Sequence, residues 1–272
     1  MTAGGAIGIV VALAFAVPLA WKWQLGIARA AGFVAAAAIV LALVTAEVGV
    51  GTFAAIAAVG GGTLAVAAAV VTWRFYRDPE RTPPERDDVV VSPADGEVVY
   101  VRRAREGVLP VATKNGTSYR LDELTKTELG IRDAIVVGVA LNFLDVHVNR
   151  APIAGTVALQ RRFPGSFGSL RRPETIFENE RATIVIDRGD LQLAVVLIAS
   201  RLVRRIVAFV RERQVLVLGE RIGAIRFGSQ VDLVLPARDD VEVVVRPGDH
   251  VRAGETVVAV IGRAAVAHGG AP

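Results

Sequence analysis

The first 73 residues carry almost no charge, and this feature constrains the fold more than any other. Only Lys22, Arg29 and Glu47 are charged there, whereas residues 74–272 hold the rest of the charged side chains. A membrane-spanning helix needs about 20 apolar residues, and this stretch has room for several. The sequence therefore predicts a hydrophobic anchor over 1–73 and a polar region of about 200 residues, enough for one good core.

Three apolar runs lie within the anchor, at 6–21, 30–46 and 48–73. They predict two to three helices; the third run has the length of a membrane span, and the first two are shorter and rich in Ala and Gly. No Lys or Arg precedes Lys22, which favours a retained anchor over a cleaved signal peptide. If all three runs span, Lys22 shares a side with the arginines after the third run. The positive-inside rule then places the polar domain at the cytoplasmic face, and a shallow hairpin would still keep it at a membrane surface.

The rest of the chain is typical of β structure. A charged, Pro-rich connector over 74–88 precedes short apolar runs that are separated by Gly and Pro, and such runs are typical of strands. Helical periodicity is weak, with its best short candidate at 121–129. We predict a mainly β (α+β) class for 89–272, a β-sandwich or barrel-like domain with hairpin repeats.

An internal repeat supports that prediction. "GERIGAI" (219–225) aligns with "GETVVAV" (254–260) at an offset of 35 residues, and "DGEVV" (95–99) echoes "AGTVA" (154–158). These segments are either equivalent hairpins of one repeated sheet or unrelated hairpins that look alike. The sequence leaves both interpretations open.

Composition excludes several function classes. The chain has no cysteine, so disulfide and thiol chemistry are excluded. Its net charge of +4 and its lack of an aromatic-rich basic motif argue against a nucleic-acid partner. Only three histidines are present and no two of them lie close in sequence, so we expect no metal site.

Three positions could carry chemistry. Asp95 lies in "SPADGEV", where it could equally stabilise a turn. His147 ends an apolar run and is either a structural residue or an acid or base near neutral pH. Ser229 follows Gly228 in "RFGSQVDLVLP", which is either a bulged strand or a reactive bond. An Asp that orients a His, which deprotonates a Ser, activates a weak hydroxyl, although no G-x-S-x-G elbow surrounds Ser229.

Together these segments resemble the phosphatidylserine decarboxylase family, in its short form with an apolar N-terminal anchor. The resemblance covers nearly the whole polar domain in order. It is carried by "FYRDPER" (75–81), "SPADGEV" (92–98), "FLDVHVNRAP" (143–152), "ENERATIVID" (178–187), "ERIGAIRFGSQVDLVLP" (220–236) and "GDHVRAGETVVAV" (248–260).

The resemblance implies a proenzyme that cuts its own backbone between Gly228 and Ser229. By analogy, Asp95 orients His147, and His147 takes the proton from the Ser229 hydroxyl, which attacks the Gly228 carbonyl. Elimination and hydrolysis then turn Ser229 into a covalent pyruvoyl cofactor. A β chain of residues 1–228 and an α chain from 229 result, with no metal and no pyridoxal phosphate.

The mature enzyme of this family decarboxylates phosphatidylserine to phosphatidylethanolamine and CO2, through a Schiff base to the pyruvoyl group. A ketone of this kind supplies the electron sink that pyridoxal phosphate supplies elsewhere, and His147 is the candidate acid. Phe143, Asn149 and Arg150 are the candidate substrate-binding residues. The resemblance further implies a phospholipid substrate held in the membrane, and it leaves room for a homo-oligomer.

The sequence departs from the family pattern at Gln230, where members usually carry Thr or Arg. Three alternatives stay open at this point. One is a decarboxylase of an archaeal-type ether phosphoserine lipid. Another is a lipoyl-like binding module, which needs a lysine at a hairpin tip, although no lysine follows Lys126. The last is a Ser/His/Asp hydrolase, which would stay uncleaved.

Overall fold

The chain divides into two compact units. The computed structural model describes residues 2–22, 27–110, 119–170, 172, 174–200, 206–225 and 229–262. The first unit comprises Met1–Arg77 with Asn142–Asp145, and the second comprises Asp78–Leu141 with Val146–Pro272.

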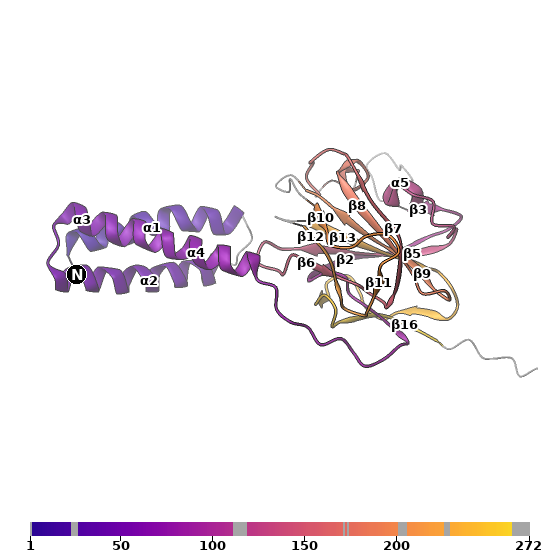
Figure 1. Cartoon of the computed structure of the whole chain (residues 1–272). Helices are drawn as coiled ribbons and strands as arrows, with labels where there is room; N and C mark the ends of the chain where they lie inside the picture. Colours follow the sequence, from indigo (N-terminus) through magenta and orange to yellow (C-terminus); the bar gives the residue numbers. More distant parts are fainter. Residues whose placement is uncertain are drawn as a thin grey trace, which may run out of the picture. The chain divides into compact units, whose positions relative to one another are not determined.

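The first unit consists of apolar helices, as the sequence predicts (Figure 1). Three of its helical stretches, of 19, 22 and 25 residues, are long and apolar enough to cross a membrane. The third of these is continuous along the chain but contains a π-helical segment, η1. The elements are α1 (Ala3–Lys22), α2 (Ile27–Val48), α3 (Thr52–Ile56), η1 (Ala57–Gly61) and α4 (Gly62–Tyr76).

Small residues allow these helices to pack closely. A Cβ on Gly4 would lie 2.7 Å from the Thr52 carbonyl oxygen, and one on Gly8 would lie 2.7 Å from Val59 Cβ. Ala38 and Ala42 of α2 complete a small core with Val59. Glycine and alanine at such contacts let helix backbones approach, which is the usual way that apolar helices associate in lipid.

The second unit is built on a curled eight-stranded antiparallel sheet (Figure 1). The order of its strands is β11-β7-β8-β9-β13-β5-β2-β15. These strands are β2 (Gly96–Ala104), β5 (Ala134–Leu141), β7 (Gly155–Phe163), β8 (Arg181–Asp187), β9 (Gln192–Ile198), β11 (Val215–Leu216), β13 (Ser229–Pro236) and β15 (His250–Val251).

Shorter sheets accompany the large one. Their orders are β1-β16-β14, β10-β12-β6 and β3-β4. Their strands are β1 (Val89–Val91), β3 (Val108–Leu109), β4 (Tyr119–Arg120), β6 (Val148–Arg150), β10 (Ile206–Ala208), β12 (Arg221–Ile225), β14 (Val241–Val243) and β16 (Val257–Ile261). The mainly β prediction is therefore confirmed.

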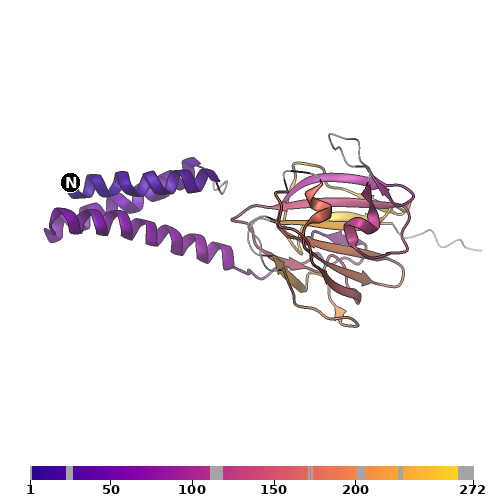
Figure 2. The ribbon, with the colours of Figure 1, turned by 90° about the horizontal axis from the view of Figure 1, so that it is seen from above.

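Both faces of the large sheet are covered. Along β13, Val231, Leu233 and Leu235 belong to one core, whereas Val234 belongs to the other, because successive side chains of a strand point to opposite faces. Two short helices, α5 (Leu121–Thr125) and α6 (Thr175–Glu178), contribute to the second core and lie side by side (Figure 2). Strand β13 is consequently buried along its full length.

The domain contains the same strand arrangement twice. We call 148–225 the inserted half, and 89–141 together with 229–261 the outer half. Strands β6 to β12 of the inserted half correspond in order to β1, β2, β5 and β13 to β16 of the outer half. Equivalent strands therefore follow in the same order from either end of the large sheet. The two halves meet at the β9–β13 pair, where Leu233 lies opposite its own equivalent, Val195.

Local details repeat as well. The β2–β5 pair has a bulge between Val98 and Tyr100, and the β7–β8 pair has one at the equivalent point, between Val157 and Leu159.

Backbone conformation and hydrogen bonds are also equivalent in the two halves. Gly219 and Gly254 both have φ of 75°, and their offset is the one seen in the sequence repeat. Val91 donates its N–H to Pro152 O, and the equivalent Arg150 donates to Pro93 O. The sequence repeat thus marks equivalent strands rather than a chance likeness of hairpins.

The inserted half enters the outer half at one point. Strands β8 and β9 are joined by a short turn, in which Arg188 N–H donates to Leu191 O over 3.0 Å. The equivalent strands β5 and β13 pair over eight residues, yet the chain between Leu141 and Ser229 passes through the whole inserted half. The two crossings between the halves therefore lie at 142–147 and 226–228.

Candidate active site at the junction of the two halves

Ser229 is the first residue of β13 and stands at the return crossing. It is only 3% exposed and pairs with Leu141, the last residue of β5. Within the described residues, its buried Oγ makes no hydrogen bond. Buried hydroxyls are normally hydrogen-bonded, so an exception of this kind marks a candidate reactive group. Gly228, the other half of the predicted cleavage bond, lies outside the described residues.

His147 is the last residue of the outward crossing and lies beside the residue that precedes the return crossing. It directly precedes β6, its side chain is buried, and its carbonyl accepts a hydrogen bond of 3.1 Å from Ile225 N–H. Ile225 ends β12, and four residue steps separate it from Ser229. A fully extended chain covers at most about 14 Å in four steps. The fold therefore brings the backbone of His147 into the neighbourhood of Ser229.

Asp95 approaches from the opposite side of β5. It precedes β2, whose Glu97 pairs with Ala140, and Ala140 pairs in turn with Gln230 on β13. Neighbouring strands lie about 4.8 Å apart, so two spacings place the start of β2 roughly 10 Å from the start of β13. Gly96 makes this approach feasible, because a Cβ there would lie 2.2 Å from Ala140 O. The backbones of Asp95, His147 and Ser229 thus lie near the same ends of strands β2, β5 and β13.

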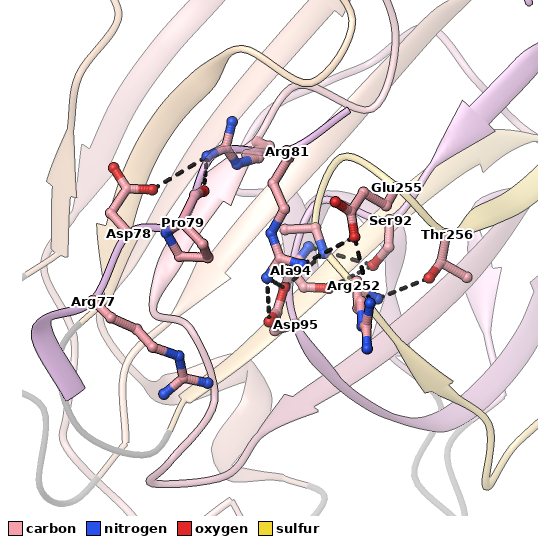
Figure 3. Close-up of polar contacts among 12 residues, drawn as sticks. Arg77, Asp78, Pro79, Arg81, Ser92, Ala94, Asp95, Arg252, Glu255 and Thr256 are labelled. Atoms are coloured by element: carbon pink, nitrogen blue, oxygen red, sulfur yellow. Dashed lines mark hydrogen bonds and ion pairs between the residues drawn. The ribbon is translucent and has the colours of Figure 1, made fainter. Parts of the chain in front are cut away.

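The Asp95 carboxylate is held by the connector (Figure 3). Arg81 Nη2 donates to both of its oxygens at 2.8 and 3.1 Å, and Ala253 N–H donates at 2.8 Å. Arg81 Nη1 also donates to Glu255 at 3.0 Å, and the Arg81 and Asp95 side chains are 9% and 11% exposed. Sequence reasoning missed Arg81. The opposite charges of Arg81 in "RDPER" and Glu255 in "GET" are the signal that could have indicated their ion pair.

Arg150 and Asn149, two candidate substrate-binding residues, lie on β6. Arg150 is buried, and its guanidinium donates to Gly219 O at 3.0 Å, Pro79 O at 2.9 Å and Asp78 at 3.2 Å. These contacts tie the connector to the inserted half. Asn149 Nδ2 donates to Pro93 O at 3.4 Å, and its buried Oδ1 has no partner within the described part of the chain.

Phe143, the third candidate, belongs to the first unit. Its ring centroid lies 5.4 Å from that of Phe75 at the end of α4. The neighbouring Leu144 carbonyl accepts a hydrogen bond of 2.7 Å from Arg77. The segment just before His147 is therefore associated with the end of the third apolar helix. The substrate-binding role of these three residues stays a prediction.

A buried polar trio lies behind Ser229 on the opposite face of β13. Gln230 Nε2 donates to Tyr100 Oη at 2.8 Å and to Asp232 Oδ1 at 2.7 Å, and Tyr100 Oη donates to Asp232 Oδ2 at 2.7 Å. Burial raises the pKa of Asp232 from 3.8 to about 6. Burial, with the adjacent Asp232 carboxylate, also raises the pKa of Tyr100 well above its usual value. Sequence reasoning singled out Gln230 only as a departure and missed Tyr100 and Asp232.

Pyridoxal phosphate, the other electron sink, binds enzymes through a lysine, and the polar region has two, Lys114 and Lys126. Lys126 follows α5 in a left-handed conformation, and Lys114 lies outside the described residues. Over the described ranges, no group of three or more His, Asp or Glu side chains could hold a metal ion.

Comparison with known proteins decides the family. The model of the phosphatidylserine decarboxylase family matches residues 68–259. The chain belongs to the phosphatidylserine decarboxylase family. The match begins within the third apolar helix and ends inside β16, so it covers the inserted half, the candidate site and all but the last two residues of the outer half.

Individual family members are similar over most of their length. A phosphatidylserine decarboxylase proenzyme of Novosphingobium aromaticivorans is 38% identical over 201 residues, covering 72% of this chain and 74% of the relative. One of Pelobacter propionicus is 39% identical over 189 residues, 69% and 76% of the two chains. A proposed archaetidylserine decarboxylase proenzyme of Methanothermobacter thermautotrophicus is 40% identical over 187 residues, 68% and 78% of the two chains.

Proposed function

We propose that this chain is the proenzyme of a membrane-associated decarboxylase of serine phospholipids and that it cuts itself between Gly228 and Ser229. Family membership supports the decarboxylase activity, a carboxy-lyase reaction. The observation that carries the position of the cut is the buried Ser229 hydroxyl, which has no hydrogen bond within the described residues, at the return crossing beside His147.

The cut is an acyl transfer followed by elimination. His147 removes the proton from Ser229 Oγ, and Oγ attacks the Gly228 carbonyl, so the peptide C–N bond breaks and an ester forms. Elimination then breaks the Ser229 Cβ–Oγ bond and leaves Gly228 as a carboxylate. One water hydrolyses the remaining enamine after it tautomerises, ammonia departs, and residue 229 becomes a pyruvoyl group. Asp95, which is ion-paired with Arg81, takes the role of the carboxylate that stabilises the protonated His147.

The residues present fit such a group. Residue 229 is buried, lies at a strand end and carries a hydroxyl that has no hydrogen-bond partner among the residues the structure describes. The pyruvoyl ketone supplies an electron sink for loss of CO2 from an amino acid. The pairing of β13 with β5 fixes the position of that residue, and burial excludes bulk water. His147 holds the proton that the substrate carbon needs after CO2 has left.

Membrane association rests on the apolar helices. We propose that they hold the domain at the cytoplasmic face, in accord with the positive-inside rule. Arg74 lies in the last turn of α4 and Arg77 follows that helix. Lys22 ends α1 and Arg29 lies in the first turn of α2, so all four cations share one side if the three stretches span. A substrate that stays in the bilayer requires a site at its surface. The α and β chains stay together as one enzyme, since β13 pairs with β5 and β9. Self-association of this enzyme is compatible with the proposal.

The shared chemistry of the relatives' names is a phosphoserine head group. The sequence identity to this chain is 38% for a relative named for phosphatidylserine and 40% for one named for the archaeal lipid, archaetidylserine. We therefore assign the head group as the recognised element. Purified enzyme incubated with vesicles of either lipid would show, by released CO2, which lipid backbone it accepts.

Intact mass measurement tests the cut. The wild-type chain is expected to give fragments 1–228 and 229–272, the second lighter by one ammonia than a fragment with an N-terminal serine. Ser229→Ala is expected to stay in one piece. Ser166→Ala is a matched control, because Ser166 also follows a glycine but its Oγ is hydrogen-bonded to Asn179 at 3.0 Å. A wild-type chain that stays intact on prolonged incubation would refute the proposal.

A further inference from the structure

The polar trio of Tyr100, Gln230 and Asp232 is unusual because it is buried on a face of the large sheet that is otherwise packed with apolar side chains. The Asp232 side chain lies on the central strand of the large sheet and is 0% exposed. Burying a carboxylate is costly unless it is paired and hydrogen-bonded. Here both of its oxygens accept hydrogen bonds, one from Tyr100 and one from Gln230, and these two residues are also bonded to each other. The three side chains therefore form a closed triangle.

The inserted half shows that the fold does not need this triangle. The residue equivalent to Tyr100 is Leu159, which occupies the same place after the bulge. The residue equivalent to Asp232 is Ala194, since both stand opposite the same position of the neighbouring strand, Gly138 in one half and Val185 in the other. At the equivalent place the domain thus packs leucine, alanine and valine: Ala194 and Val185 belong to its second core, and Leu159 packs against that core.

Space for the triangle depends on Gly138. A Cβ on Gly138 would lie 2.5 Å from the Tyr100 ring, so the ring lies directly over the backbone of β5. The equivalent Val185 faces a leucine instead. The outer half therefore has a glycine, a tyrosine and a carboxylate where the inserted half has an apolar contact, and the carboxylate, Asp232, is the fourth residue after the predicted cut.

The trio cannot reach the reacting atoms, because Gln230 and Asp232 point to the face of β13 opposite that of Ser229. It acts on Ser229 through the backbone. Gln230 pairs with Ala140 on one side and Ile198 on the other, whereas Ser229 pairs only with Leu141. Residue 229 thus forms the terminal pair of β13, and its position depends on residue 230, which is paired on both sides.

We propose that Tyr100, Gln230 and Asp232 form a terminus clamp, which holds residue 230 so that residue 229 keeps its place once the bond to 228 is cut. The inference rests on the proposed function. Cleavage turns residue 229 into a chain terminus, and chain termini are poorly ordered unless they are tied down. The three residues are positioning residues, and the clamp serves both the cut and the reaction of the mature enzyme.

The clamp is tested with Gln230→Leu, Asp232→Asn and Tyr100→Phe in the full-length chain. Gln192→Leu is the matched control, because Gln192 is equivalent to Gln230 in the inserted half. Three quantities are measured: the rate of self-cleavage, the rate at which phenylhydrazine labels the cleaved enzyme, and kcat and KM per labelled site. Hydrogen exchange at the first amides of β13 is followed in a Ser229→Ala background.

A misplaced reacting group commonly costs up to about a hundredfold in rate. Gln230→Leu and Asp232→Asn are expected to slow cleavage and lower kcat by about ten- to a hundredfold, with KM unchanged and exchange faster at the start of β13 only. Tyr100→Phe should show a smaller loss, and Gln192→Leu none. Equal rates in the clamp variants and Gln192→Leu would overturn the clamp alone. An uncut wild-type chain would overturn both proposals, because no terminus would exist to be held.

Discussion

Replacing Asp232 by asparagine should change how the stability of the domain depends on pH. Asp232 has a pKa of about 6 in the folded chain, against 3.8 for an exposed carboxyl, because burial disfavours its charge. The folded state therefore binds a proton between these values when the unfolded state does not. The contribution of Asp232 to the free energy of unfolding is therefore most favourable below pH 3.8, falls as the pH rises towards 6, and is constant above that pH. Each pH unit corresponds to about 1.36 kcal/mol, so the loss is about 3 kcal/mol in total.

The assay compares Asp232→Asn with the parent chain, both carrying Ser229→Ala so that neither is cut. Asparagine cannot ionise, so the variant escapes this loss while other titrating groups cancel in the comparison. A domain of this size shifts its Tm by about 2–4 °C per kcal/mol. The Tm of the variant, measured by calorimetry in detergent, should therefore gain about 6–12 °C on the parent between pH 4 and pH 7.5. A constant difference across that range would refute the reasoning.

Two further substitutions test the site and the sheet. Arg81→Gln leaves the largely buried Asp95 carboxylate without its ion-pair partner, so we expect a loss of about 3–5 kcal/mol and slower self-cleavage, measured as Tm and fragment yield; Glu255→Gln, at the more exposed partner, should cost far less. Gly138→Ala places a methyl group against the Tyr100 ring and should cost about 1–3 kcal/mol by thermal unfolding, and Tyr100→Leu in the same chain should restore most of it. Rescue failing in that double variant would show that the ring is not the obstacle.

Much of the fold follows from local sequence. Alternating or continuous apolar runs predicted the strands, because a strand needs only a few β-branched residues and a turn on either side. The runs at 134–141, 182–187 and 231–236 coincide with β5, β8 and β13. The short helix expected at 121–129 is present as α5, over Leu121–Thr125. The apolar helices followed in the same way from length and composition.

The arrangement of those strands did not follow from local sequence. Two weak sequence echoes indicated a repeat, but they could not show that one half is inserted into the other. That arrangement depends on pairing between segments far apart in the chain, such as β5 with β13. In the inserted half a short turn joins the paired strands β8 and β9, whereas the whole inserted half lies between the equivalent strands β5 and β13. The pairing of β5 with β13 therefore places Leu141, His147 and Ser229 at one junction.

The candidate site divides in the same way. Asp95, His147 and Ser229 were named from the sequence because their residue types carry recognisable chemistry and their motifs resemble a family. The partners that hold them are ordinary arginine, tyrosine and aspartate residues, whose importance depends on burial and on neighbours contributed by distant segments. Neither Arg81 nor Asp232 differs locally from residues on a solvated face.

The sequence by itself determined the apolar anchor, the strand-rich domain and the residue types available for chemistry, because hydrophobicity and turn propensity act between near neighbours. Only the tertiary structure decided that Arg81 neutralises Asp95 and that Ser229 begins a strand at the crossing between two equivalent halves. It also decided that a buried carboxylate stands behind Ser229. Burial and ion pairing are properties of the packed chain, since they arise when distant segments exclude water from one another.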